Sequence, residues 1–176
     1  AKPFHEDLSE VPYVEPADFV ADAKQRPAAF ITGGASGIGK ATAQRLLNLG
    51  WTVGSYDVQE TTWGTDDIPE GQLITGHLDV TDRANWDEAL ADFTAKTGGR
   101  LDFLFNNAGI IIDGLLVDQP EDKIRALFDI NCLGVTFGAQ AAHPYLKATK
   151  GAVMISMSSA SAIFGQPEIS TCLLYT

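Results

Sequence analysis

From residue 28 onward, short apolar runs alternate with longer stretches in which apolar residues recur at helical spacing. The apolar runs predict five β-strands, at Ala28–Ile31, Trp51–Tyr56, Leu73–Val80, Leu101–Phe105 and Ala152–Met157. Strands this short and this apolar are typical of a parallel sheet that is covered on both faces.

The stretches between the runs predict helices. The first runs from about Lys40 to Leu49 and ends at Gly50, because glycine favours the helix C-terminus. Thr81 is expected to cap the second helix. This second helix places large apolar side chains on one face, at Trp86, Leu90 and Phe93.

A third, long helix is expected to open at Pro120, and Pro144 is expected to kink it or end it. Regular alternation of strands and helices predicts an α/β fold: a doubly wound parallel sheet, Rossmann-like, in three α/β/α layers. We predict one dinucleotide-binding domain over residues 28–176, incomplete because C-terminal strands are missing. Residues 1–27, with four prolines, are expected to form an extended lead-in.

Charge and composition restrict the partners. The 176 residues carry a formal net charge of −11, and a surface of this sign repels nucleic acid and anionic membranes. No apolar run approaches the roughly 20 residues that span a bilayer. Cys132 and Cys172 are far apart and have no metal spacing, so we expect reduced thiols in a cytoplasmic protein, without a metal site.

The turn after the first strand, ITGGASGIGKAT, contains four glycines within seven positions. A helix N-terminus at such a turn offers free N–H groups and a partial positive charge to a phosphate. Gly33 would permit the sharp turn, Gly37 would let the backbone approach a diphosphate, and Gly39 would let the helix pack closely on the sheet.

Two other interpretations of this turn remain. Gly34 to Lys40 also matches the body of a nucleoside-triphosphate loop, but Ala41 stands where that motif needs Ser or Thr for magnesium. A glycine-rich turn that binds no ligand is the second alternative.

An acidic residue about 20 positions beyond the glycines favours the dinucleotide interpretation. Asp57 closes the second strand, 18 positions after Gly39. Its carboxylate would accept hydrogen bonds from the adenosine ribose and would repel the additional 2′-phosphate of NADP. We therefore expect NAD in preference to NADP.

The sequence resembles the short-chain dehydrogenase/reductase family over roughly residues 28–167. The resemblance rests on five motifs in the order of the family: TGGASGIG, the Asp after the second strand, LDVTD, NNAG and SSASAIFGQP. It implies hydride transfer between a nicotinamide and a secondary alcohol or ketone, and full-length relatives that form homodimers or homotetramers.

The resemblance also implies roles for the matching residues. Asp79 would accept from the adenine amino group. The cofactor-binding set that follows is Gly33, Ser36, Gly37, Ile38, Gly39, Asp57, Asp79, Val80, Asn107, Ala108 and Gly109.

Two polar residues match catalytic positions of the family. Asn131 matches an Asn that anchors a proton-relay water, although an Asn here could also be a buried, hydrogen-bonded core residue. Ser159 matches the serine that would stabilise charge on the substrate oxygen. A shifted register, with Ser156, Ser158 or Ser161 in this role, or a serine-rich turn without chemistry, remains open.

The family pattern fails near the C-terminus. The catalytic tyrosine should stand at position 172, where this chain has Cys172, and its partner lysine at position 176, where it has Thr176. Tyr175 is three positions late. The abrupt ending CLLYT suggests a reading-frame shift, alternative splicing or a truncated chain.

Two functions therefore remain as hypotheses: an NAD-dependent oxidoreductase, or a catalytically inactive dinucleotide-binding fragment without the Tyr-x-x-x-Lys pair. In either case the fifth strand is expected to present an exposed apolar edge.

Overall fold

A computed structural model describes residues 26–63 and 68–163 of the chain. The parallel strands are β1 (Ala28–Thr32), β2 (Thr52–Asp57), β3 (Leu73–His77), β4 (Phe103–Asn106) and β5 (Val153–Ser156). The helices are α1 (Gly37–Asn48), α2 (Arg83–Lys96), α3 (Glu121–Phe128) and α4 (Val135–Ala148), with a π-helical segment η4 (Asp129–Gly134) and the short 3-10 turns η3 (Leu116–Asp118) and η5 (Ala160–Ala162). Cys172 and Tyr175 lie outside the described residues.

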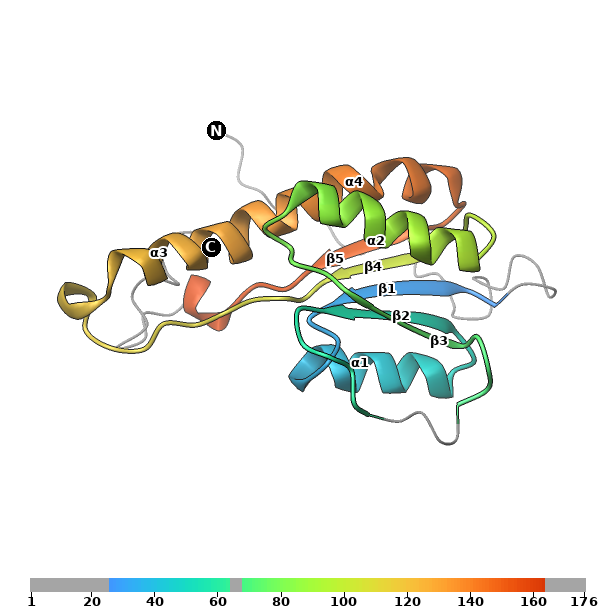
Figure 1. The fold of residues 1–176 in the computed structure, drawn as a ribbon, viewed down its shortest axis with the longest axis horizontal. Helices are drawn as coiled ribbons and strands as arrows, with labels where there is room; N and C mark the ends of the chain where they lie inside the picture. Colours follow the sequence, from blue (N-terminus) through green and yellow to red (C-terminus); the bar gives the residue numbers. More distant parts are fainter. Residues whose placement is uncertain (1–25, 64–67, 164–176) are drawn as a thin grey trace.

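The strands form a single parallel sheet in the order β3-β2-β1-β4-β5. The chain passes from β1 outward to β3 and then returns to β4 on the other side of β1, so the order reverses next to β1. Helix α1 covers one face of the sheet, and α2 and α4 cover the other (Figure 1). This is the predicted doubly wound, three-layer arrangement. In such folds the crevice at the point of reversal is the usual ligand site.

Each face of the sheet has its own apolar core. On the α1 face, Ala43 and Leu47 pack with Ile31, Val53 and Trp63. On the α2/α4 face, the core is built around large buried side chains, among them Phe30, Tyr56, Trp86, Leu90, Phe93 and Leu104. Trp86, Leu90 and Phe93 share one face of α2 as the periodicity predicts, and all three are fully buried.

The third strand and the second helix differ from the prediction. β3 ends at His77 rather than Val80, because the Asp79 N–H donates to the Asn85 side chain and so does not bond to the neighbouring strand. The N-cap of α2 is Asp82, not Thr81. The Asp82 carboxylate accepts from the N–H groups of Ala84 and Asn85, and a carboxylate caps a helix more strongly than threonine does.

The first and third helices also differ. α1 begins at Gly37, three residues before the predicted Lys40, and the Lys40 N–H donates to the Ser36 carbonyl in its first turn. The long helix is interrupted by η4, which separates α3 from α4. Pro144 does not end α4, which continues to Ala148.

β5 lies at one edge of the sheet, and its side chains are exposed. Val153, Met154 and Ile155 each expose between 43 and 49% of their surface. The expected exposed apolar edge is therefore present in the part of the chain that the structure describes. Among those same residues, no helix has the length and hydropathy needed to cross a membrane.

Candidate functional site

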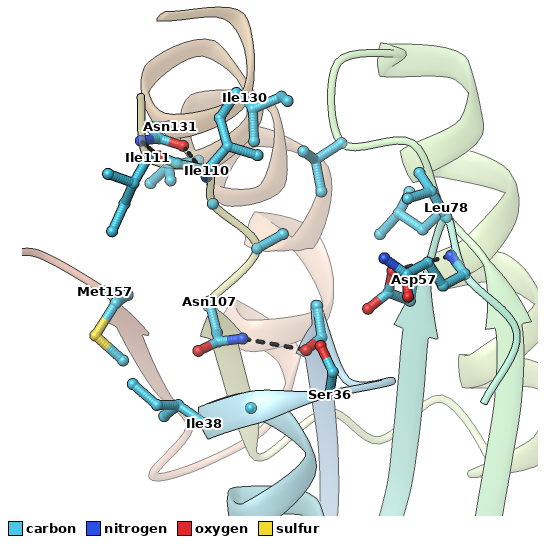
Figure 2. Close-up of a pocket in the computed structure, with 18 of the residues that line it drawn as sticks. Ser36, Ile38, Asp57, Leu78, Asn107, Ile110, Ile111, Ile130, Asn131 and Met157 are labelled. Carbon is cyan, nitrogen blue, oxygen red and sulfur yellow. Dashed lines mark hydrogen bonds between the residues drawn. The ribbon is translucent and has the colours of Figure 1, made fainter. Parts of the chain in front are cut away.

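A cleft of about 620 Å³ lies at the carboxyl ends of β1, β2 and β4. Asp57 and Leu78 lie on one side of the cleft, and Ile38, Ile111 and Met157 on the other (Figure 2). Ten of the eleven residues predicted to bind the cofactor line it, all except Gly39, and so do Asn131 and Ser159. Segments that are far apart in the sequence are thus brought together at one edge of the sheet.

The glycine turn has little room for side chains at two of its three key positions. Gly33 has φ +66°, and a Cβ there would lie 2.9 Å from the Ala108 Cα. A Cβ on Gly39 would overlap the Gly33 carbonyl oxygen. Gly37 has φ +54°, but no atom lies within 4 Å of its Cβ position. Gly37 therefore presents bare backbone to open space.

Asp57 binds the glycine turn directly. Its Oδ2 accepts from the Ala35 N–H at 3.1 Å, and its Oδ1 accepts from the Gln59 N–H at 3.0 Å. These bonds fix the carboxylate at the rim of the cleft.

Two tryptophans hold carbonyl groups of the loops that build the cleft. The Trp63 indole N–H donates to the Gly34 carbonyl at 3.0 Å, and the Trp86 indole N–H donates to the Val80 carbonyl, also at 3.0 Å. Sequence analysis missed both roles, because an isolated tryptophan carries no signal beyond its apolarity.

Thr32 joins the glycine turn to the end of β4. Its hydroxyl accepts from the N–H groups of Asn107 and Ala108 at 3.0 Å each, and it donates to the Phe105 carbonyl at 3.5 Å. The Asn107 side chain donates back to the Thr32 carbonyl at 2.9 Å. The NNAG segment and the first strand thus form one rigid floor for the cleft.

One oxygen of the Asp79 carboxylate is already hydrogen-bonded within its own loop. Its Oδ1 accepts from the Thr81 N–H at 2.9 Å and from the Thr81 hydroxyl at 2.7 Å. No hydrogen bond to Oδ2 occurs among the described residues, and Asp79 lines the cleft.

The Asn131 side chain is bound at both ends by the backbone of Ile110. Its Oδ1 accepts from the Ile110 N–H and its Nδ2 donates to the Ile110 carbonyl, each at 2.9 Å. Asn131 lies in the π-helical segment, and π turns are frequently found at functional sites. The next residue, Cys132, is half-buried, and this burial raises the pKa of its thiol.

Ser159 lies at the exposed end of the cleft, just after β5. Its hydroxyl oxygen accepts from the Ser161 N–H at 3.2 Å and lies 3.1 Å from the Ser161 hydroxyl. Ser158 and Ser159 line the cleft, whereas Ser156 and Ser161 are not among its lining residues. Within the described residues, no three His, Cys, Asp or Glu side chains gather as metal ligands would.

The fold and the cleft define a doubly wound protein whose glycine turn, acidic strand end and NNAG segment converge on one crevice. Residues 27–171 match the family model described as short chain dehydrogenase, so the chain belongs to this family.

Two relatives of this chain have names that point to different substrates. The chain is 35% identical over 143 residues to a 3-oxoacyl-(acyl-carrier-protein) reductase of Thermotoga maritima, an alignment that covers 78% of this chain and 57% of that protein. It is 33% identical over 150 residues to an L-2,3-butanediol dehydrogenase of Corynebacterium glutamicum, with 81% and 57% covered. The chain therefore spans little more than half the length of these relatives.

Solved structures of the same architecture support the fold. A short chain dehydrogenase/reductase from Burkholderia phymatum in complex with NAD has a TM-score of 0.75 and 24% identity, covering 84% of this chain and 54% of that one. A 3-ketoacyl-(acyl-carrier-protein) reductase from Brucella melitensis complexed with NADH has a TM-score of 0.76 and 22% identity, with 84% and 63% covered.

Proposed function

We propose that this chain forms the dinucleotide-binding part of an NAD-dependent oxidoreductase that interconverts a secondary alcohol and a ketone. The observation that carries the proposal is the convergence of an open glycine cradle at Gly37, a fixed carboxylate at Asp57 and a polar group at Ser159 on one cleft. When bound, the nicotinamide supplies the hydride acceptor or donor.

The residues of the chain would bind the dinucleotide and orient the substrate. The N-terminus of α1 and the bare backbone at Gly37 would hold the diphosphate, since both offer N–H groups to an anion. Asp57 would accept from the adenosine ribose, and Asp79 from the adenine. Ser159, which lines the cleft, would hydrogen-bond the substrate oxygen and stabilise charge that develops on it.

Asn131 would act as a positioning residue in this cleft. Its side chain is engaged with the backbone of Ile110, and it therefore fixes the segment after the NNAG motif rather than pointing an amide at the substrate. A rigid wall at this point would hold the reacting groups in register, which is where much of enzymatic rate enhancement originates.

We propose NAD in preference to NADP, because the Asp57 carboxylate would repel a 2′-phosphate at the same rim. Calorimetric titration of the purified chain with NADH and, separately, with NADPH tests the proposal. We expect NADH to bind and NADPH to bind at least about tenfold more weakly, as a free-energy difference of about 1.4 kcal/mol produces. Failure of both dinucleotides to bind would refute the proposed function.

The second candidate is a dinucleotide-binding chain that does not turn over. It is favoured by Cys172, which stands where the resemblance places the catalytic tyrosine. An assay of NADH formation with a panel of secondary alcohols separates the two. Binding without turnover indicates the inactive chain, and turnover indicates that another group supplies the proton transfer.

A further inference from the structure

The peptide unit between Gly34 and Ala35 is held at both of its polar ends. Its carbonyl, on Gly34, accepts from the Trp63 indole N–H at 3.0 Å. Its N–H, on Ala35, donates to the Asp57 carboxylate at 3.1 Å. In a trans peptide the C=O and N–H bonds lie in one plane and point in opposite directions. Rotation of this peptide plane would therefore break its hydrogen bonds to Trp63 and Asp57.

Trp63 reaches this peptide from the loop between β2 and β3. It is 6% exposed and packs in the core on the α1 face, so its indole ring is fixed. Earlier in the same loop, the Thr61 hydroxyl lies 3.1 Å from the Ser55 hydroxyl. A Cβ on Gly34 would overlap Ser55, so the turn and β2 are in direct contact. The loop therefore wraps the outer side of the glycine turn.

We propose that Trp63 is a positioning residue of the dinucleotide site, acting through the Gly34–Ala35 peptide on Asp57. By fixing the peptide plane, Trp63 directs the Ala35 N–H onto the carboxylate and keeps that N–H from a 2′-phosphate. The carboxylate then stays oriented for the ribose hydroxyls. This inference rests on the proposed binding of NAD and names a residue that selects the dinucleotide.

The test compares Trp63→Phe with Trp51→Phe. Phenylalanine removes the indole N–H donor and fills most, but not all, of the space, so the control must carry the same loss of ring volume. Trp51 is half-buried beside the same core, its ring stacks edge-on against Phe103, and its indole N–H makes no hydrogen bond among the described residues. It therefore reports the effect of a tryptophan-to-phenylalanine change without loss of the peptide contact.

We expect Trp63→Phe to weaken NADH binding about fivefold, the scale of one lost hydrogen bond, and to lower the ratio of NADH to NADPH affinity. Trp51→Phe should leave both affinities within about twofold of wild type, because its contacts are separate from the site. Unfolding temperatures are measured alongside, so that a loss of stability can be compared with the loss of binding.

A double-mutant cycle with Asp57→Ala distinguishes positioning from general packing. If Trp63 acts through the carboxylate, Trp63→Phe changes NADH affinity in the wild-type background and has almost no further effect in Asp57→Ala. Equal losses in both backgrounds, or an unchanged affinity in Trp63→Phe, would overturn the inference and leave the proposed function standing. Absence of NADH binding by the wild-type chain would overturn both.

Discussion

Under the proposed function Asp57 serves two purposes, because the carboxylate oxygens proposed to bind a ribose also hold the backbone of the turn. It accepts one N–H from Ala35 and one from Gln59. The spacing of this aspartate from the glycines was sufficient to predict its place in the cleft. Its bond to Ala35 could not be predicted, since that bond depends on how the turn folds back over β2.

We expect Asp57→Ala to weaken NAD binding by about 1–3 kcal/mol, the scale of hydrogen bonds to a charged group. The measurement is calorimetric titration with NAD. Asp113→Ala is the control, because it removes a carboxylate in the loop after β4 that does not line the cleft. An unchanged affinity for NAD, together with binding of NADP that stays as weak as in the wild type, would show that the assignment of Asp57 is wrong.

Asn131→Ala should destabilise the fold by about 1–3 kcal/mol, because it leaves both polar groups of Ile110 without their partners. Asn131→Asp should be no better than Asn131→Ala. A carboxylate can still accept from the Ile110 N–H, but it cannot donate to the Ile110 carbonyl. Chemical denaturation measures both effects. A fully stable aspartate variant would show that the amide donor is unimportant.

At the scale of elements, strand β2 is joined to helix α2 by hydrogen bonds among polar side chains. The Tyr56 hydroxyl donates to Asp92 at 2.8 Å, and Lys96 lies 2.8 Å from the same carboxylate. Lys96, with a smaller contribution from Tyr56, lowers the pKa of Asp92 despite some opposing desolvation. Burial, with Asp92 beside it, raises the pKa of Tyr56.

These pKa shifts define the pH range over which the contact contributes to the stability of the fold. The lowered pKa of Asp92 means that its contribution to stability is present above about pH 4 and is lost as the pH falls through the folded-state value. The raised pKa of Tyr56 means that its contribution is present below about pH 10 and is lost at higher pH.

Asp92→Asn should therefore lower the unfolding temperature between those limits, and the difference from wild type should shrink as the pH falls through the folded-state pKa of Asp92. The expected effect near neutral pH is small, about 0.5 kcal/mol, because Asp92 and Lys96 are largely exposed. Asp87→Asn, on the same helix and paired with Arg83, is the control. A difference that persists undiminished at low pH would contradict the assignment.

The order and type of the main elements followed from periodicity, since five apolar runs and the helical spacing around Trp86 mark them clearly. Three features depended on contacts that the pattern does not contain. The Asn85 side chain ends β3 early, the Asp82 carboxylate replaces Thr81 as the cap, and the π-helical segment holds Asn131 against Ile110. In each case a side chain is hydrogen-bonded to the backbone, and such a bond does not change the spacing of apolar residues in the sequence.

At the scale of the whole molecule, net charge and exposed apolar surface have opposite effects on self-association. The net charge of −11 favours dispersal of the molecules in solution, whereas the exposed side chains of β5 favour self-association. The sequence predicted both features. Ten of the eleven residues predicted to bind a cofactor line one cleft, because residues at the carboxyl ends of neighbouring parallel strands converge.

We expect Ile155→Lys to reduce concentration-dependent self-association, measured by analytical ultracentrifugation. Leu116→Lys is the matched control: both residues are 49% exposed, and the charge change is the same, but Leu116 lies on η3 rather than on a strand edge. Equal behaviour of the two variants would show that net charge, not the edge of β5, governs association.

The hydroxyl of Thr32 has one proton and two lone pairs, and the three contacts to Phe105, Asn107 and Ala108 use all of them. The amides of Asn107 and Ala108 lie beyond the end of β4, outside the strand ladder, yet this hydroxyl occupies both. Their deuterium uptake should therefore be as slow as that of the neighbouring sheet amides. The sheet, judged by hydrogen exchange, extends two residues further than its strands, to the floor of the cleft.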